Sequence, residues 1–202
     1  RLGIRVYPTP APQTSGIANY YQSSDMERRV CKLIGFAGAF QPAEIPDLPV
    51  KAILISGIIA GEVTLPLLRQ LSQRAPLGLE VQGFVRVPQG EDLVFKPWPE
   101  REEGLGLITY LKCDQAEAEH LTGEADLRAA AHKLAALGPR EILITRSEGP
   151  TVFVDGSDRT NAVSFLMLEA THLLKIPTNV CLRVHEKLDP ELMRRAVTYL
   201  FE

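Results

Sequence analysis

The sequence predicts an α/β fold with a mostly parallel sheet, and three observations support this. Short apolar runs that resemble strands alternate with segments of helical spacing from residue 50 onward. Gly or Pro bounds most of these segments. Residues 1–49 differ in composition from the rest of the chain, because prolines and polar residues surround two strand-like runs. Alternating strands and helices are typical of α/β proteins. We therefore expect an α/β body at 50–202, and at 1–49 mainly a small β element and its connections.

The N-terminal element is expected to contain two strands, at residues 17–21 and 28–36. Residues 22–25 between them are mostly types that hydrogen-bond their own backbone in turns. Prolines 42, 46 and 49 then mark the exit from this element.

The body is expected to alternate strands with helices that glycines and prolines terminate. In chain order, we predict a strand at 51–56, a helix at 62–74, a strand at 79–84, a proline-rich loop through residues 88–99, a strand at 107–112, a helix at 115–121, a second helix from Leu127 to Gly138, and strands at 141–145 and 151–154.

Composition excludes several classes of protein. The formal net charge is −3, from 22 basic and 25 acidic residues, so no basic footprint for nucleic acid or an anionic membrane is present. The longest apolar stretch, at 52–60, is too short to span a bilayer, and no signal-peptide pattern occurs. The three cysteines are scattered, which indicates reduced thiols in a cytoplasmic protein.

In parallel sheets, ligands bind beyond the carboxyl ends of the strands. Asp114 and Glu117 follow one predicted strand end. Asp at a helix N-cap with Glu three residues later is typical of a capping box. Alternatively, the two carboxylates organise a hydrated Mg²⁺ near phosphates, since Mg²⁺ needs few protein oxygens.

Two further strand ends carry candidate binding residues. Residues 145–149 (TRSEG) offer hydroxyls and backbone N–H groups to phosphate oxygens, or form a plain β-turn. Gln82 and Gly83 mark either a close backbone approach to a ligand or a bulge. The P-loop, the dinucleotide-binding fingerprint and the G-x-S-x-G elbow are all absent.

Four segments occur in an order that resembles the ribokinase-like, or PfkB, carbohydrate kinase family. They are QTSGIANYYQSSDMERRV (13–30), LEVQGFVR (79–86), LKCDQAEAEHLTG (111–123) and LGPREILITRSEGPTVFVDG (137–156). They resemble, respectively, the strand of the small β lid, the D-x-Q-G strand, the N-x-x-E motif and the nucleotide loop. The resemblance implies a ribokinase-like three-layer α/β/α sandwich with a small β lid.

The resemblance also implies transfer of the γ-phosphoryl group of ATP, with Mg²⁺, to a hydroxyl of a small sugar-like substrate. A homodimer through the lid is a further implication. The resemblance assigns Glu117 and Asp114 (which replaces the family's Asn) to Mg²⁺ and phosphate, and Thr145, Ser147, Gly149 and Thr160 to the nucleotide. Asn19, Tyr21 and Gln82 are candidates for substrate contact, with packing between lids as the alternative for Asn19 and Tyr21.

The family's G-x-G-D signature, which carries the catalytic base, does not follow the lead-in at residues 158–160. No residue of this sequence is therefore assigned as the base. We expect that segments are missing before residue 1 and between Thr160 and Asn161. Ser147 and Pro150 also replace glycines of the nucleotide loop. Two alternatives remain: a non-catalytic relative used for binding or assembly, and an unrelated Rossmann-like nucleotide binder.

Overall fold

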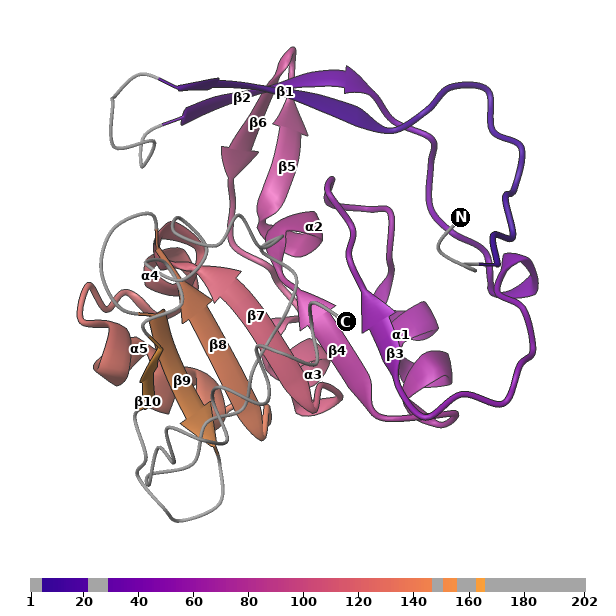
Figure 1. Cartoon of the computed structure of the whole chain (residues 1–202). Coiled ribbons are helices and arrows are strands. Elements are labelled where there is room, and N and C mark those ends of the chain that lie inside the picture. Colours follow the sequence, from indigo (N-terminus) through magenta and orange to yellow (C-terminus); the bar gives the residue numbers. More distant parts are fainter. Residues whose placement is uncertain (1–4, 22–28, 147–150, 156–162, 166–202) are drawn as a thin grey trace, which may run out of the picture.

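A computed structural model describes residues 5–21, 29–146, 151–155 and 163–165, which form two sheets (Figure 1). In the larger one, the body sheet, β3, β4, β7 and β8 are parallel, whereas β9 and β10 each run antiparallel to the preceding strand. Its spatial order is β10 (Val163–Phe165), β9 (Thr151–Asp155), β8 (Glu141–Thr145), β7 (Tyr110–Asp114), β4 (Leu77–Glu80) and β3 (Ile53–Ile55).

Four of the five described α-helices between the parallel strands lie on one face of the body sheet. Each successive parallel strand is added on the same side of the previous one, so right-handed crossovers bring their helices to a common face. These are α1 (Leu65–Ser72), α3 (Arg101–Gly106), α4 (Gln115–Thr122) and α5 (Leu127–Ala135). In the part of the chain that the structure describes, no helix combines the length and the apolar character needed to cross a membrane.

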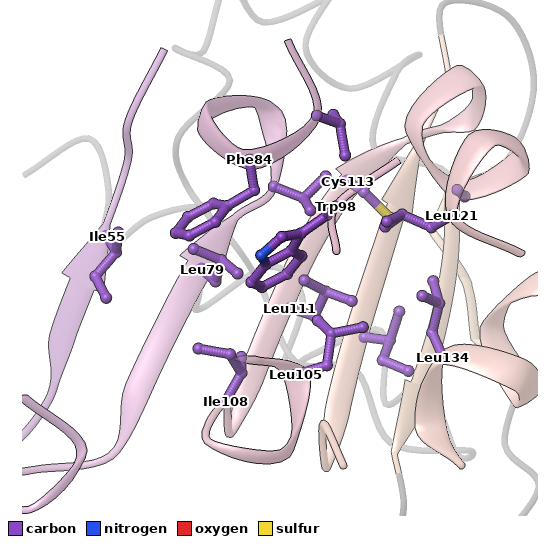
Figure 2. Packing of buried hydrophobic residues seen from close by; sticks show 14 of the residues in the cluster. Ile55, Leu79, Phe84, Trp98, Leu105, Ile108, Leu111, Cys113, Leu121 and Leu134 are labelled. Carbon is purple, nitrogen blue, oxygen red and sulfur yellow. The ribbon is translucent and has the colours of Figure 1, made fainter. Parts of the chain in front are cut away.

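The main hydrophobic core fills the space between this face and the helices (Figure 2). Leu111 and Cys113 of β7 are buried there, as are Ile142 and Ile144 of β8. Because side chains alternate along a strand, the intervening residues project to the opposite face. Both described cysteines, Cys31 and Cys113, have buried thiols.

The smaller, antiparallel sheet, the lid sheet, crosses above the body sheet (Figure 1). Cys31 and Leu93 are paired in it and pack on Ile59 of the body in a second, small core. The two strands expected near the N-terminus are confirmed. The sheet has the order β1 (Gly16–Tyr21), β2 (Arg29–Gly35), β6 (Asp92–Phe95) and β5 (Arg86–Gln89), so half of its strands come from outside residues 1–49.

The strand predicted at 79–84 was too long, because β4 ends at Glu80 and α2 (Gln82–Val85) follows. Residues 81 and 83–85 are all buried. The sequence therefore lacks the helical alternation of apolar and polar residues that would have predicted α2. A Cβ on Gly83 would lie 2.6 Å from the carbonyl carbon of Gly57. The close approach at Gly83 is therefore to the protein's own backbone.

Three other elements also differ from the prediction. The proline-rich loop contains the β5–β6 hairpin, which turns at Gly90 with φ of 63°. The strand predicted at 107–112 starts only at Tyr110, since the short helix α3 precedes it. Helix α1 begins at Leu65 and not at Glu62, whose carboxylate accepts hydrogen bonds from the N–H groups of Ile58 and Ile59. A 3₁₀ turn, η1 (Pro42–Glu44), precedes β3.

The contact at Gly83 leads to a stability prediction. We expect Gly83→Ala to lower the free energy of unfolding by about 2 kcal/mol, because the methyl group forces two backbone segments apart. Chemical denaturation measures the change. Gly106→Ala is the matched control, since its nearest neighbour would be 3.9 Å away. A G83A variant as stable as G106A would contradict the close contact.

Candidate active site at the carboxyl edge of the sheet

Polar side chains gather where the parallel strands of the body sheet end. Asp114 is the last residue of β7 and is paired in register with Thr145, the last residue of β8. Glu80 ends β4 and is paired with Lys112 of β7. Parallel strands end at one edge of a sheet, and in α/β proteins this edge is the usual place for a ligand. The Thr145 hydroxyl donates to the carbonyl of Cys113 at 3.5 Å.

Asp114 and Glu117 form the predicted capping box at the start of α4. The Asp114 Oδ1 atom accepts from the N–H of Glu117, and Glu117 Oε2 accepts from the N–H of Asp114, both at 2.8 Å. The two carboxylates therefore satisfy the first turn of the helix. Each uses one oxygen in the box, which leaves Asp114 Oδ2 and Glu117 Oε1 for other partners.

Glu117 is an unusual helix cap because its side chain is buried, with only 4% of its surface exposed. Burial, followed by the neighbouring charge of Asp114, raises the pKa of Glu117 to about 7. Ionised Glu117 is therefore costly in the protein alone, and a nearby positive charge would stabilise it.

The lid sheet reaches this site through Arg29, a residue that the sequence analysis did not select. The Arg29 Nη2 atom lies 3.6 Å from Asp114 Oδ2. Burial alone would lower the pKa of Arg29, but the charge of Asp114 raises it above its ordinary value. The sequence offered one signal, namely that Arg29 is two residues from Cys31 in the same predicted strand and so shares its face.

A second polar cluster, which the sequence analysis also missed, lies at the ends of β3 and β4. Glu80 Oε1 is 3.1 Å from Lys112 Nζ, and the Ser56 hydroxyl donates to Glu80. Burial would raise the pKa of Glu80, but the Ser56 hydrogen bond and Lys112 together lower it. Ser56 directly follows β3 and Glu80 ends β4, whereas Lys112 lies within β7.

The donor set at Asp114 and Glu117 fits a hydrated Mg²⁺. Within the described residues, no group of three or more His, Cys, Asp and Glu side chains is placed to hold a metal. Mg²⁺ commonly keeps several waters and is bound by one or two carboxylates together with substrate phosphates. Asp114 Oδ2, which also faces Arg29, and Glu117 Oε1 are the oxygens that the capping box does not use, and they match that requirement. In the described residues, Zn²⁺-type ligation by Cys and His has no counterpart at this site.

The structure places the remaining predicted residues in different ways. Asn19 and Tyr21 lie on β1, where both are exposed, and Asn19 Oδ1 accepts from the thiol of Cys31 at 2.9 Å. Gln82 begins α2, and its side-chain amide donates to the Ile58 carbonyl at 3.2 Å. Ser147, Gly149, Thr160 and the Thr160–Asn161 junction lie outside the described residues.

A pocket of about 700 Å³ lies elsewhere, against α3 and α4. Trp98, Arg101 and His120 are among its lining residues. Neither Asp114 nor Thr145 contributes to it, so this pocket is separate from the carboxyl edge.

Comparisons with known proteins agree with one another. A family model described as pfkB family carbohydrate kinase matches residues 14–170. A solved structure of a pyrophosphate-dependent kinase in the ribokinase family, complexed with a pyrophosphate analog and myo-inositol, is 32% identical with a TM-score of 0.66. The match covers 73% of this chain and 51% of that one. None of the curated proteins compared with the chain matches it.

Two further structures are similar. A pyrophosphate-dependent myo-inositol-1 kinase, converted into a myo-inositol-3 kinase by a double substitution, is 32% identical over 73% of this chain and 50% of its own, with a TM-score of 0.64. A fructokinase from Vibrio cholerae O395 is similar in fold, at 13% identity over 74% of this chain and 50% of its own, with a TM-score of 0.54. The chain thus spans about half the length of these structures.

The buried Glu117 predicts a specific dependence of stability on pH. Its pKa is about 7 in the folded protein against an ordinary value of 4.5. Its stabilising contribution is therefore complete below about pH 4.5 and is lost as the pH rises through about 7. We expect Glu117→Gln to remove this loss and to be up to about 3 kcal/mol more stable than the unsubstituted protein at pH 8.

Denaturant unfolding of both proteins from pH 4 to pH 8, without divalent cations, measures the difference. Asp126→Asn is the control, because Asp126 caps α5 at an exposed position and Asn is an equally good cap. Parallel stability curves for E117Q and the unsubstituted protein would contradict the buried, ionisable carboxylate.

Proposed function

We propose that this chain, which belongs to the pfkB family of carbohydrate kinases, forms part of an enzyme that phosphorylates a hydroxyl of a small sugar-like polyol. The fold is ribokinase-like. The observation that carries the proposal is the contact between Arg29 of the lid sheet and Asp114 of the body, 3.6 Å apart. It brings the lid over the carboxylate pair at the carboxyl edge, where a small molecule would be enclosed.

In the proposed reaction, the acceptor oxygen forms a bond to the terminal phosphorus of the donor. The bridging P–O bond of the donor breaks, and the hydroxyl proton passes to a base. We assign that base to the G-x-G-D segment expected outside this sequence. Such reactions depend mostly on positioning and electrostatic stabilisation.

Each site residue has a proposed part in this positioning. Asp114 and Glu117 would hold Mg²⁺ through water, and the bound ion would neutralise charge on the donor phosphates. Thr145, with Ser147, Gly149 and Thr160, would contact the donor. Asn19, Tyr21 and Gln82 would contact the acceptor.

The donor and acceptor are proposed as chemical classes. ATP, the donor expected from the family resemblance, and pyrophosphate, named for structures that are 32% identical, both present a phosphoanhydride. Myo-inositol, named for both of those structures, belongs to the proposed class of polyols. A cytoplasmic location and independence from nucleic acid and membranes remain predictions from composition.

An activity assay of the full-length protein tests the proposal. We expect phosphate transfer to a member of a panel of polyols and sugars, with either ATP or pyrophosphate, in the presence of Mg²⁺. Glu117→Gln should lower kcat by about a hundredfold although it stabilises the protein, whereas D126N should leave kcat unchanged. Absence of transfer from either donor to the whole panel would contradict the kinase and favour the binding or assembly alternative.

We also propose a homodimer through the lid sheet. Tyr20 and Ile34 of this sheet are 60% and 70% exposed, and large exposed apolar side chains in one region mark interaction surfaces. Ile34→Glu should convert a dimer to a monomer in analytical ultracentrifugation. Leu48→Glu, at an exposed position of the loop before β3, should leave the dimer intact. A monomeric unsubstituted protein would contradict the proposal.

A further inference from the structure

Arg86 is a buried charge for which the described part of the chain supplies no anionic partner. Three charged residues are buried there: Glu62, Arg86 and Glu117. Glu62 and Glu117 both accept backbone hydrogen bonds. Arg86 is only 7% exposed, yet its side chain makes neither a hydrogen bond nor an ion pair with the described residues, and its Nε is buried without a partner.

The strand register shows which face of the lid sheet carries Arg86. Arg86 is paired with Phe95, and Pro88 with Leu93, in the β5–β6 hairpin. Residues two apart on a strand share a face, so Arg86 and Phe95 project from the same side as Leu93. Leu93 packs with Cys31 and Ile59 of the body. Arg86 therefore projects from the side of the lid sheet that faces the body.

Arg29 projects from the same face, because it lies two residues before Cys31 on β2. Its Nε is also buried without a hydrogen-bond partner. The body-facing side of the lid sheet thus carries two guanidinium groups. The carboxylate of Asp114 lies 3.6 Å from the Arg29 member of this pair.

The one contact that Arg86 does make compensates only partly for its burial. Its guanidinium carbon lies 3.7 Å from the centre of the Phe95 ring, and this ring stacks on His120 of α4 at 5.0 Å. A cation–π contact orients the guanidinium and favours its charge, but it satisfies none of the N–H donors. A buried guanidinium is most stable when its N–H groups meet an oxyanion, and phosphate matches its geometry.

We propose that Arg86, with Arg29, binds a phosphate group of the small molecule held between the lid sheet and the body. The position of that molecule rests on the proposed function, whereas phosphate binding by Arg86 does not require turnover. Phe95 acts as the platform that holds the Arg86 guanidinium in place. The phosphate belongs either to the donor or to a phosphorylated acceptor, and kinetics separate these two sources.

Calorimetric titration of the full-length protein with inorganic phosphate and with pyrophosphate tests the proposal. We expect Arg86→Met to weaken binding of one of these anions at least about tenfold. Arg86→Lys should restore part of the affinity, because Lys keeps the positive charge but lacks the planar array of N–H donors. Arg29→Met should weaken the same anion. The R29M variant keeps the test decisive if R86M does not fold.

Arg101→Met is the matched control. Arg101 also has a buried Nε without a partner, but it donates to the Leu121 carbonyl and lines the separate pocket. Unchanged anion affinity in folded R86M would overturn the proposal and leave Arg86 as a structural contact to Phe95. Equal losses in R101M and R86M would overturn it as well, since they would indicate a non-specific charge effect.

Steady-state kinetics identify the source of the phosphate. If R86M raises the KM for the donor alone, Arg86 binds the phosphate of the donor. If it raises the KM for a phosphorylated acceptor alone, Arg86 binds the phosphate of the acceptor. Either result supports the proposal. If the enzyme is active and both KM values and anion affinities are unchanged in R86M, the proposal fails and the kinase stands. If no activity is found but R86M loses phosphate affinity, the kinase fails and the phosphate site stands.

Discussion

The candidate site depends on the reciprocal hydrogen bonds between Asp114 and Glu117 at the junction of β7 and α4. They end the strand, begin the helix and hold two carboxylates at the carboxyl edge of the sheet. They also keep Glu117 buried, which makes its ionised form costly unless a cation is near. A purely structural cap has no need of burial, as exposed Asp126 demonstrates at α5. Burial of Glu117 therefore favours a chemical role.

The lid sheet is joined to this site by chain connections as well as by contacts. Its strands β5 and β6 continue directly from α2, whose Gly83 packs against Gly57 of the body. Its strand β2 carries Arg29, which pairs with Asp114. The lid sheet is therefore held to the body at two places. Packing of Gly83 against Gly57 holds its base, and the charge pair of Arg29 and Asp114 holds β2 at the carboxylates. Movement of the lid would change the surroundings of both carboxylates.

Local sequence signals predicted the parts of the fold that depend on local interactions. A short apolar run within the strand–helix rhythm identified β8, and the Asp114–Glu117 spacing identified the capping box. The helix α2 and the β5–β6 hairpin were missed because both depend on contacts distant in sequence: Gly83 against Gly57, and Leu93 against Cys31. Arg29 and Arg86 were missed for the same reason, since their importance follows from pairing between strands.

A crystal structure of the full-length protein with Mg²⁺, a polyol and a pyrophosphate analogue tests the account most directly. The account predicts phosphate oxygens beside Asp114, Glu117 and Arg86, with the polyol against the body-facing side of the lid sheet near Asn19. Phosphate bound in the pocket at Trp98, with the carboxyl edge free of both ligands, would contradict it.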